Sequence, residues 1–266
     1  MTIEFNVMSF NLRYNNAGDG ANAWPRRVEK VVRTIRRYDP LLIGTQEGLI
    51  DMLTDLDERL PEFGRLGMGR LGGAEGEFNA IFYKKSELVV VDFGQFWLSD
   101  APEVPASVGW DADLPRICTR GRFRHRATGR ELYFFNTHLD HRGREARIRG
   151  SRLVGRRIDE ARAEAELPLI LTGDFNCHPS HEPVRYLRGE AEERMATRLA
   201  DAYGALPDGR AGLTAHDFRG GAEGEPIDYI FVTEECDVKS VEVVRDVVGG
   251  GYPSDHYPIV ASLRIR

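Results

Sequence analysis

The sequence predicts an α/β fold with mixed β-sheets, and three observations support this prediction. Short runs rich in β-branched and aromatic residues alternate with helical patterns in the first part of the chain. Similar runs follow one another like hairpins in the middle and at the end, which a purely parallel sheet would not contain. No linker, internal repeat or low-complexity segment divides the 266 residues, so we expect a single domain over residues 1–266.

Strands are expected where an apolar run is bounded by turn-forming residues. These runs cover residues 3–12, 41–45, 78–83, 88–97, 132–137, 167–172, 227–232 and 258–265. Another strand is expected to start around Cys118. Segments 64–76 and 102–115 are rich in glycine or proline and are expected to be loops.

Amphipathic patterns between the strands predict helices. The first has apolar residues at helical spacing over 28–38, with Pro25 suited to its first turn and Pro40 ending it. The second has the same spacing over 50–60 and stops before Pro61. The third, over about 144–165, places apolar residues among many charges, as a surface helix does.

The net negative charge of the chain makes some classes of binding partner less favourable than others. Acidic residues outnumber basic ones by 42 to 36, and a net charge of −6 argues against a long electrostatic grip on duplex DNA. A small phosphorylated substrate held by a few arginines is compatible with this balance.

The location is expected to be cytoplasmic. The start of the chain has no basic region followed by an apolar stretch, and no run approaches the roughly 18 apolar residues of a membrane span. The three cysteines are far apart, so neither a disulfide framework nor a zinc site is expected.

Polar side chains with chemical function stand at the ends of six expected strands. They are Asn11, Glu47, His138, Asp174, Asn176, Asp228, Asp255 and His256. Strand ends beside loops are where a sheet holds functional groups on a rigid support. Oxygen donors dominate and thiolates are missing from the set, so the expected metal is Mg²⁺, with Mn²⁺ or Ca²⁺ as alternatives.

Each of these residues also has an ordinary structural explanation. Asp174 after Gly173 could form a turn, Glu47 could cap the following helix, and His138 could be a hydrogen-bonded core histidine. Six such strand ends in one chain, with no competing motif, favour a shared site over six separate explanations.

The same strand ends form an ordered series of short motifs. These are Ser9-Phe10-Asn11, Gln46-Glu47, Asn136-Thr137-His138, Gly173-Asp174-Phe175-Asn176, Ile227-Asp228-Tyr229-Ile230 and Ser254-Asp255-His256-Tyr257-Pro258. Each motif is weak alone, but the series covers nearly the whole chain and resembles the endonuclease/exonuclease/phosphatase superfamily, nearest to its deadenylase-like branch. The resemblance implies a DNase I-like, four-layer α/β/β/α sandwich with two packed mixed β-sheets. It also implies Mg²⁺-dependent hydrolysis of a phosphoester.

The resemblance further implies a metal site. Glu47 would be the principal ligand, with Asn11 beside it and Asp255 contributing directly or through water. Mg²⁺ keeps several waters and needs few protein ligands, which agrees with so small a set.

The same resemblance implies roles for the remaining strand-end residues. His256, oriented by Asp228, would accept a proton from the attacking water, and Asp174 would align or activate that water. Asn176 would donate to a phosphate oxygen, and His138 would bind the same phosphate. The sequence leaves open whether Asp174 or the His256–Asp228 pair is the base.

Substrate contacts are expected from residues near these motifs. We expect Arg116, His141 and Arg147 to contact phosphate, and Trp110 to stack on a base. Arg147 has an alternative partner in Glu145.

The expected partner is a phosphorylated substrate, with single-stranded nucleic acid or a nucleotide included, and no membrane or protein partner is expected. The ester is a phosphodiester or phosphomonoester of a nucleic acid, a nucleotide or a small metabolite. The alternative function is a catalytically silent binding module on the same sandwich. It predicts damage to Glu47, Asp174 or His256, and all three are intact.

Overall fold

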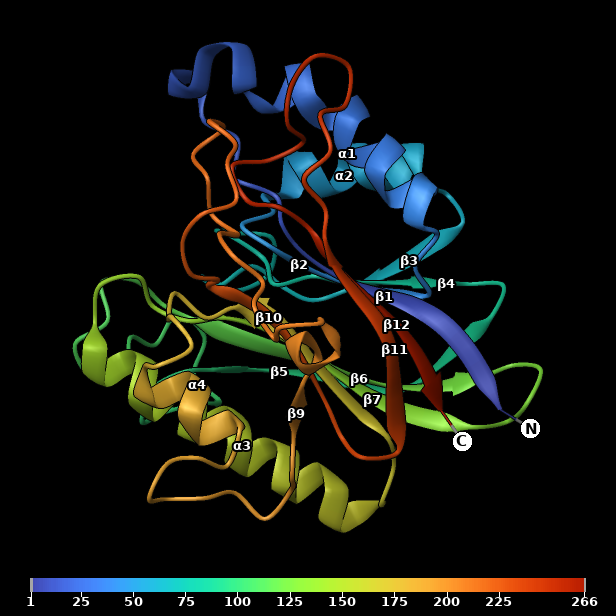
Figure 1. Ribbon diagram of the computed structural model, residues 1–266. Helices are drawn as coiled ribbons and strands as arrows, with labels where there is room; N and C mark the ends of the chain where they lie inside the picture. The colour runs from blue at the N-terminus through green and yellow to red at the C-terminus, as the bar shows by residue number, and fades with distance from the viewer. Residues whose placement is uncertain (1, 266) are drawn as a thin grey trace.

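Two stacked β-sheets form the middle of the molecule in the computed structural model, which describes residues 2–265 (Figure 1). The first sheet has the order β11 (Cys236–Val243), β12 (Ile259–Ile265), β1 (Ile3–Asn11), β2 (Leu42–Gln46), β4 (Ile81–Lys84) and β3 (Phe63–Leu66). The second has the order β5 (Leu88–Trp97), β6 (Ile117–His125), β7 (Glu131–His138), β8 (Leu169–Asp174), β10 (Asp228–Val232) and β9 (Ala200–Asp201). The pairs β1–β2 and β7–β8 are parallel and their neighbours are antiparallel, so both sheets are mixed.

Helices cover the outer faces of both sheets. α1 (Trp24–Tyr38) and α2 (Ile50–Arg59) lie over the first sheet, and α3 (Arg144–Glu164) and α4 (Glu182–Leu187) lie over the second (Figure 1). Two short 3-10 segments, η1 (Ala17–Asn22) and η2 (Ala202–Ala205), lie in the connections. This is the four-layer α/β/β/α sandwich that the sequence predicted, so the expected fold class is confirmed.

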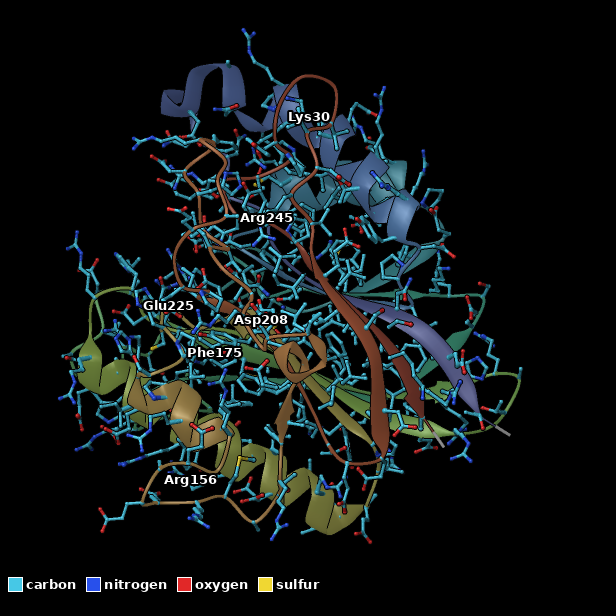
Figure 2. All side chains as sticks on the ribbon, viewed as in Figure 1. Lys30, Arg156, Phe175, Asp208, Glu225 and Arg245 are labelled. Atoms are coloured by element: carbon cyan, nitrogen blue, oxygen red, sulfur yellow. The ribbon has the colours of Figure 1, made fainter. Side chains whose placement is uncertain are left out.

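Successive side chains of a strand point to opposite faces of its sheet, and the buried ones form two apolar cores. In β1, Val7 belongs to the cluster shared with the second sheet, whereas Met8 belongs to the cluster shared with α1 and α2. Phe175, just after β8, packs edge-on against Tyr229 with ring centroids 5.6 Å apart. Figure 2 shows Phe175 inside the molecule, whereas Arg156 of α3 projects from its outer surface.

A buried polar bridge joins the two sheets beneath the strand ends. The side-chain amide of Asn136 in β7 donates to the carbonyl oxygens of Thr45 and Ala80, at 2.8 and 3.0 Å. Its own oxygen accepts hydrogen bonds from Gln46 Nε2 and Thr172 Oγ1, at 2.7 and 3.0 Å. Because buried polar groups are costly without partners, these bonds favour one relative position of the sheets.

The structure corrects the expected loop over 64–76 at its start. Residues 64–66 belong to β3, which pairs antiparallel with β4. A Cβ at position 64 would lie 2.4 Å from the Tyr83 ring, so Gly64 allows close packing within a strand rather than a turn. The expected loop over 102–115 contains no helix or strand.

One α-helix and two strands of the structure had no sequence prediction. α4 and β9 are too short to give a periodic signal. β11 is a strand at the end of its sheet with several exposed polar residues, so its pattern resembles a loop. Within residues 2–265, no helix is both long enough and apolar enough to cross a membrane.

Candidate active site

Three neighbouring strands of the second sheet carry ionisable side chains in one row. His138 ends β7, Asp174 ends β8, and Asp228 begins β10. His138 is paired with Asp174 in the parallel ladder, and Asp228 is paired with Asp174 in the antiparallel ladder. All three side chains are buried. The register of the sheet therefore fixes an imidazole and two carboxylates side by side.

The first sheet adds Asn11 and Glu47 to this row. Asn11 ends β1 beside Gln46 of β2, and Glu47 follows directly. The Asn11 amide nitrogen donates to Glu47 Oε1 and to Asp174 Oδ2, each at 3.0 Å, and so connects the two sheets. Glu47 has a φ of 62°, a left-handed conformation that is unusual for a residue with a side chain. The Tyr14 backbone N–H stabilises its carboxylate by donating to Oε2 at 3.0 Å.

His256 reaches the site from the segment before β12. Its Nδ1 lies 2.9 Å from Asp228 Oδ2, and its Nε2 lies 3.9 Å from Asp174 Oδ2. Asp255 lies 3.6 Å from Arg13 Nε and accepts a hydrogen bond from Ser254 Oγ at 3.2 Å. The carboxylate–imidazole pair expected from the sequence is thus formed in the structure.

Asn176 closes the site on the side of β7. Its backbone has a φ of 46°, and its N–H donates to Asp174 Oδ1 at 2.9 Å. Its side-chain amide lies 3.0 Å from His138 Nε2 and donates to the Leu139 carbonyl at 3.1 Å. The eight strand-end residues expected to share a site therefore lie together.

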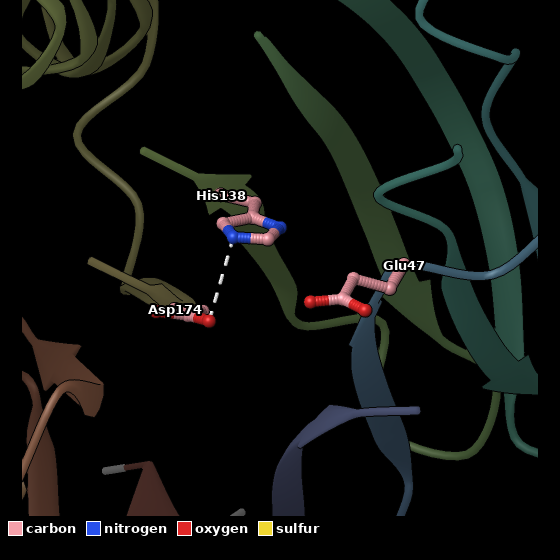
Figure 3. A group of neighbouring side chains, drawn as sticks. All are labelled: Glu47, His138 and Asp174. Atoms are coloured by element: carbon pink, nitrogen blue, oxygen red, sulfur yellow. Dashed lines mark ion pairs between the residues drawn. The ribbon is translucent and has the colours of Figure 1, made fainter. Parts of the chain in front are cut away.

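Two sets of these side chains have the spacing of metal ligands. Glu47, His138 and Asp174 form one set, drawn in Figure 3, where the imidazole and the two carboxylates face one another. Asp174, Asp228 and His256 form the other. Within each set the ligand atoms lie within 4.8 Å of one another. Asp174 belongs to both sets and is the centre of the arrangement.

The pKa shifts reflect crowded, buried charge. Burial and the neighbouring Asp228 raise the pKa of Asp174 to about 7. Burial also raises the pKa of Asp255. For His256, burial lowers the pKa, but Asp228 outweighs it and the net shift is strongly upward. Burial and the nearby Arg116 lower the pKa of His138. Several buried carboxylates lie close together here, and a bound cation would offset their mutual repulsion.

The residues expected to contact substrate are only partly gathered. Arg116 is buried 3.4 Å from Asp140 Oδ2, and its Nη2 lies 3.0 Å from His141 Nδ1. Arg147 donates to the Asp140 carbonyl at 3.0 Å. Arg116 and His141 therefore lie beside the Asp140 carboxylate, and Arg147 lies at the backbone carbonyl of the same residue.

Trp110 lies apart from that group. Its Nε1 donates to Asp100 Oδ1 at 3.0 Å, and Arg149 lies over its ring at 5.9 Å. Both contacts are on the outer side of α3, where Trp110 lines a separate depression with Arg149.

Sequence reasoning missed two arginines that organise the site. Arg13 forms the ion pair with Asp255 and also pairs with Asp19 at 3.0 Å. Arg27 of α1 is fully buried and donates to the carbonyl oxygens of Leu12, Arg13, Asn22 and Pro253. It thereby ties the segment after Asn11 to the segment before Asp255. A single arginine within a helical pattern gives no sequence signal for such a role.

A third arginine lies in the glycine-rich loop after β3. Arg70 forms an ion pair with Glu77 at 2.9 Å, and both line a small cavity with Arg116 and His138. The glycines of this segment predicted a loop and gave no signal for a side chain at the site.

Comparison with known proteins agrees with this geometry. The model of the Endonuclease/Exonuclease/phosphatase family matches residues 8–256. A solved structure of a family protein from Bacteroides thetaiotaomicron is 34% identical, with a TM-score of 0.91, and the match covers 100% of this chain and 99% of that one. A mannosyl-6-phosphatase from the same organism is 36% identical, with a TM-score of 0.88, over 97% of this chain and 99% of that one.

A more distant relative is Protein angel of Drosophila melanogaster. It is 27% identical over 178 residues, which cover 63% of this chain and 48% of the relative. The chain thus spans about half the length of that relative. The matched region of the family model contains all eight strand-end residues, from Asn11 to His256. The chain belongs to the Endonuclease/Exonuclease/phosphatase family.

Proposed function

We propose that the protein is a Mg²⁺-dependent hydrolase of phosphate esters that acts on small phosphorylated metabolites. The observation that carries this proposal is the convergence of strand ends from both sheets on Asp174. Hydrolysis of a phosphate ester needs an aligned water, a proton acceptor and positive charge near the phosphoryl oxygens. The residues around Asp174 can align the water and accept its proton, and they can hold a cation that supplies the positive charge.

The donor set fits Mg²⁺. Glu47, Asp174, Asp228 and Asp255 crowd together, and Arg13 is the arginine that pairs with one of them, Asp255. We infer that Glu47 is the principal ligand, with Asn11 and Asp255 beside it. Oxygen donors with few thiolate or imidazole competitors suit a hard cation, and Mn²⁺ or Ca²⁺ could take the same place. When bound, the metal would stabilise negative charge developing on the phosphoryl oxygens.

The His256–Asp228 pair is suited to accept a proton. Asp228 holds Nδ1 of the imidazole at 2.9 Å, so the other nitrogen, Nε2, faces Asp174. Nε2 and the Asp174 carboxylate thus face one position, where a water could lie within reach of both. A cation bound beside these carboxylates would oppose the upward shift of the His256 pKa. We infer that the neutral imidazole then takes the proton from this water and that Asp174 aligns it.

His138 and Asn176 are suited to hold the phosphate. Burial and Arg116 lower the pKa of His138, so it would act as a neutral hydrogen-bonding group. The Asn176 amide at 3.0 Å fixes the position of that imidazole. Arg116, His141 and Arg147 would contact the rest of the substrate, whereas Trp110 would stack only on a substrate long enough to reach the outer side of α3.

A small sugar phosphate is the proposed substrate class. A relative that is 36% identical over 97% of this chain is a mannosyl-6-phosphatase. The net charge of −6 opposes long nucleic acids, because phosphate-backbone binding needs a basic face. The three buried free cysteines also suit a reducing compartment and support a cytoplasmic location.

The function is tested by measuring phosphate release from a panel of sugar phosphates, nucleotides and oligonucleotides with Mg²⁺ and with Mn²⁺. We expect sugar phosphates to be the best substrates and Asp228→Asn to reduce kcat by about 10²- to 10⁴-fold. Asp246→Asn, which alters an exposed ion pair with Arg37, is the matched control. An unchanged kcat in Asp228→Asn would exclude the proposed dyad, and no turnover of any ester would favour a silent binding module.

A further inference from the structure

A cavity of about 900 Å³ lies between α3 and α4, next to the proposed active site. Its walls come from the first two turns of α3, from the segment after Asn176, and from α4 with the residues that follow it. α3 and α4 lie close together on the outer face of the second sheet (Figure 1). None of the strand-end residues lines this cavity, so it is a separate feature of the molecule.

The backbone that carries Asn176 into the active site also contributes the next residue to the cavity. Cys177 lines the cavity and directly follows Asn176, whose amide touches His138. On the other wall, Arg147 lines the cavity and donates to the carbonyl of Asp140, the residue that pairs with Arg116. α3 also starts only a few residues after the end of β7, so its first turn lies at the active-site edge of the sheet.

The charges around the cavity are not balanced. Arg152 pairs with both Glu182 and Glu193, at 2.9 and 3.1 Å. In contrast, Arg144, Arg147 and Arg185 have no carboxylate partner among residues 2–265. Four arginines and three glutamates line the cavity, so one positive charge is in excess.

Arg144 and Arg147 are one helical turn apart on α3 and line the cavity together with His181. Burial, His178 and these two arginines lower the pKa of His181. Arginines that have no carboxylate partner can donate charge-assisted hydrogen bonds to a phosphate.

We propose that this cavity is a second anion-binding subsite, in which Arg144, Arg147 and Arg185 hold a second phosphate group of a small substrate. The proposal rests on the proposed function, since the first phosphate would be the one hydrolysed beside Asp174. With this second subsite, the protein should bind small sugar bisphosphates more tightly than the corresponding monophosphates. The limited size of the cavity and the acidic protein favour a small ligand over a nucleic acid.

The test compares fructose 6-phosphate with fructose 1,6-bisphosphate. Calorimetric titration in EDTA measures the Kd of each, and phosphate release with Mg²⁺ measures kcat/KM. We expect the unaltered protein to bind the bisphosphate about tenfold more tightly, as expected for charge-assisted hydrogen bonds to a second phosphate. In the double variant R144A/R185A, that preference should be lost in both measurements.

Arg149→Ala is the matched control, because Arg149 lies on the same helix but pairs with Glu145 outside the cavity. This variant should keep the bisphosphate preference. Equal Kd values for the two sugars in the unaltered protein, or a preference that persists in R144A/R185A, would overturn the subsite. Tighter binding of a single-stranded oligonucleotide, lost in the same variant, would also overturn it by identifying a nucleic-acid ligand. Preferential binding without any turnover would overturn the proposed function and leave the subsite intact.

Discussion

Glu47 illustrates how single residues are held in place for the proposed chemistry. Its left-handed backbone costs roughly 1–3 kcal/mol, a cost that proteins tolerate mainly where surrounding contacts fix the residue. Here the Tyr14 N–H and the Asn11 amide hold both carboxylate oxygens. The strained backbone therefore directs the carboxylate toward Asp174, and this strain is an independent sign of a functional position.

Arg27 is the residue whose replacement should disturb this arrangement from a distance. Burial lowers its pKa to about 10, but four carbonyl acceptors keep its guanidinium hydrogen-bonded. A lysine cannot reach four acceptors at once. We expect Arg27→Lys to lower the free energy of unfolding by about 2–4 kcal/mol in urea titrations.

The same substitution should also reduce kcat and raise the Mg²⁺ concentration needed for half-maximal activity, because Asn11 and Asp255 flank the segments that Arg27 joins. The neighbouring Arg26→Lys, on an exposed side chain, serves as the control. Full activity with a normal Mg²⁺ requirement in Arg27→Lys would show that Arg27 has a purely structural role.

The sequence located several strand ends correctly, and the roles assigned to the side chains there stay predictions. Asn11, Asp174 and His256 were found because each follows or precedes a clear apolar run, and runs of this kind define the edge of a sheet. Arg13 and Arg27 were missed because their roles depend on contacts to backbone carbonyls and on segments distant in sequence. Such contacts leave no periodic pattern.

At the scale of elements, the polar bridge centred on Asn136 links β7 to β2 and β4. We expect Asn136→Ala to lower the free energy of unfolding by about 3 kcal/mol or more, because it removes four buried hydrogen bonds, to Thr45, Ala80, Gln46 and Thr172. Chemical denaturation measures this loss. Thr128→Ala, in the turn between β6 and β7, is the control. A loss smaller than that of the control would show that the sheets are held in register by apolar packing alone.

The segment before β10 should make stability depend on pH through His216. This imidazole is buried, stacks on Tyr257 at 3.8 Å, and burial lowers its pKa from 6.5 to about 4. The unfolded chain therefore binds a proton more readily than the folded protein between these values. Stability is lost as the pH falls through this window, by up to about 3 kcal/mol.

In His216→Phe, the stability difference between pH 7 and pH 4.5 should be smaller than in the unaltered protein, as measured by urea denaturation at both pH values. His178→Gln, on an exposed histidine, should leave the difference unchanged. An identical pH dependence in His216→Phe would show that other groups cause the acid sensitivity.

The elements that were predicted and those that were missed differ in length and in burial. β1, β8 and α1 combine a clear period with a buried face. β3 was read as a loop because Gly64 there serves packing against Tyr83, a contact that depends on the partner strand. Pairing between distant segments is thus what local patterns could not supply.

At the scale of the whole molecule, the proposed metal site belongs to both sheets, because Glu47 follows β2 and Asp174 ends β8. A cation bound there stabilises the folded protein only, since the unfolded chain has no such site. We expect 10 mM Mg²⁺ to raise Tm by several degrees, and EDTA to reverse the rise; at a ligand concentration 100 times Kd the stabilisation is about 2.7 kcal/mol.

Glu47→Ala should abolish this rise in Tm, whereas the surface variant Glu29→Ala should keep it. Differential scanning calorimetry provides the measurement. A Mg²⁺ effect of the same size in Glu47→Ala would place the cation elsewhere. The expectation of one domain over residues 1–266 stays a prediction, as does the identity of the metal.

The antiparallel pairing of β1 with β12 has a consequence for biosynthesis. Ile3 pairs with Ile265 and Ser9 with Ile259, so β1 gains this neighbour only after β12 has been synthesised. His256 precedes β12, and Arg27 bonds across 226 positions to Pro253. A nascent chain on the ribosome therefore cannot complete the site around Asp174 until β12 has been translated, and the proposed activity would begin only after that step.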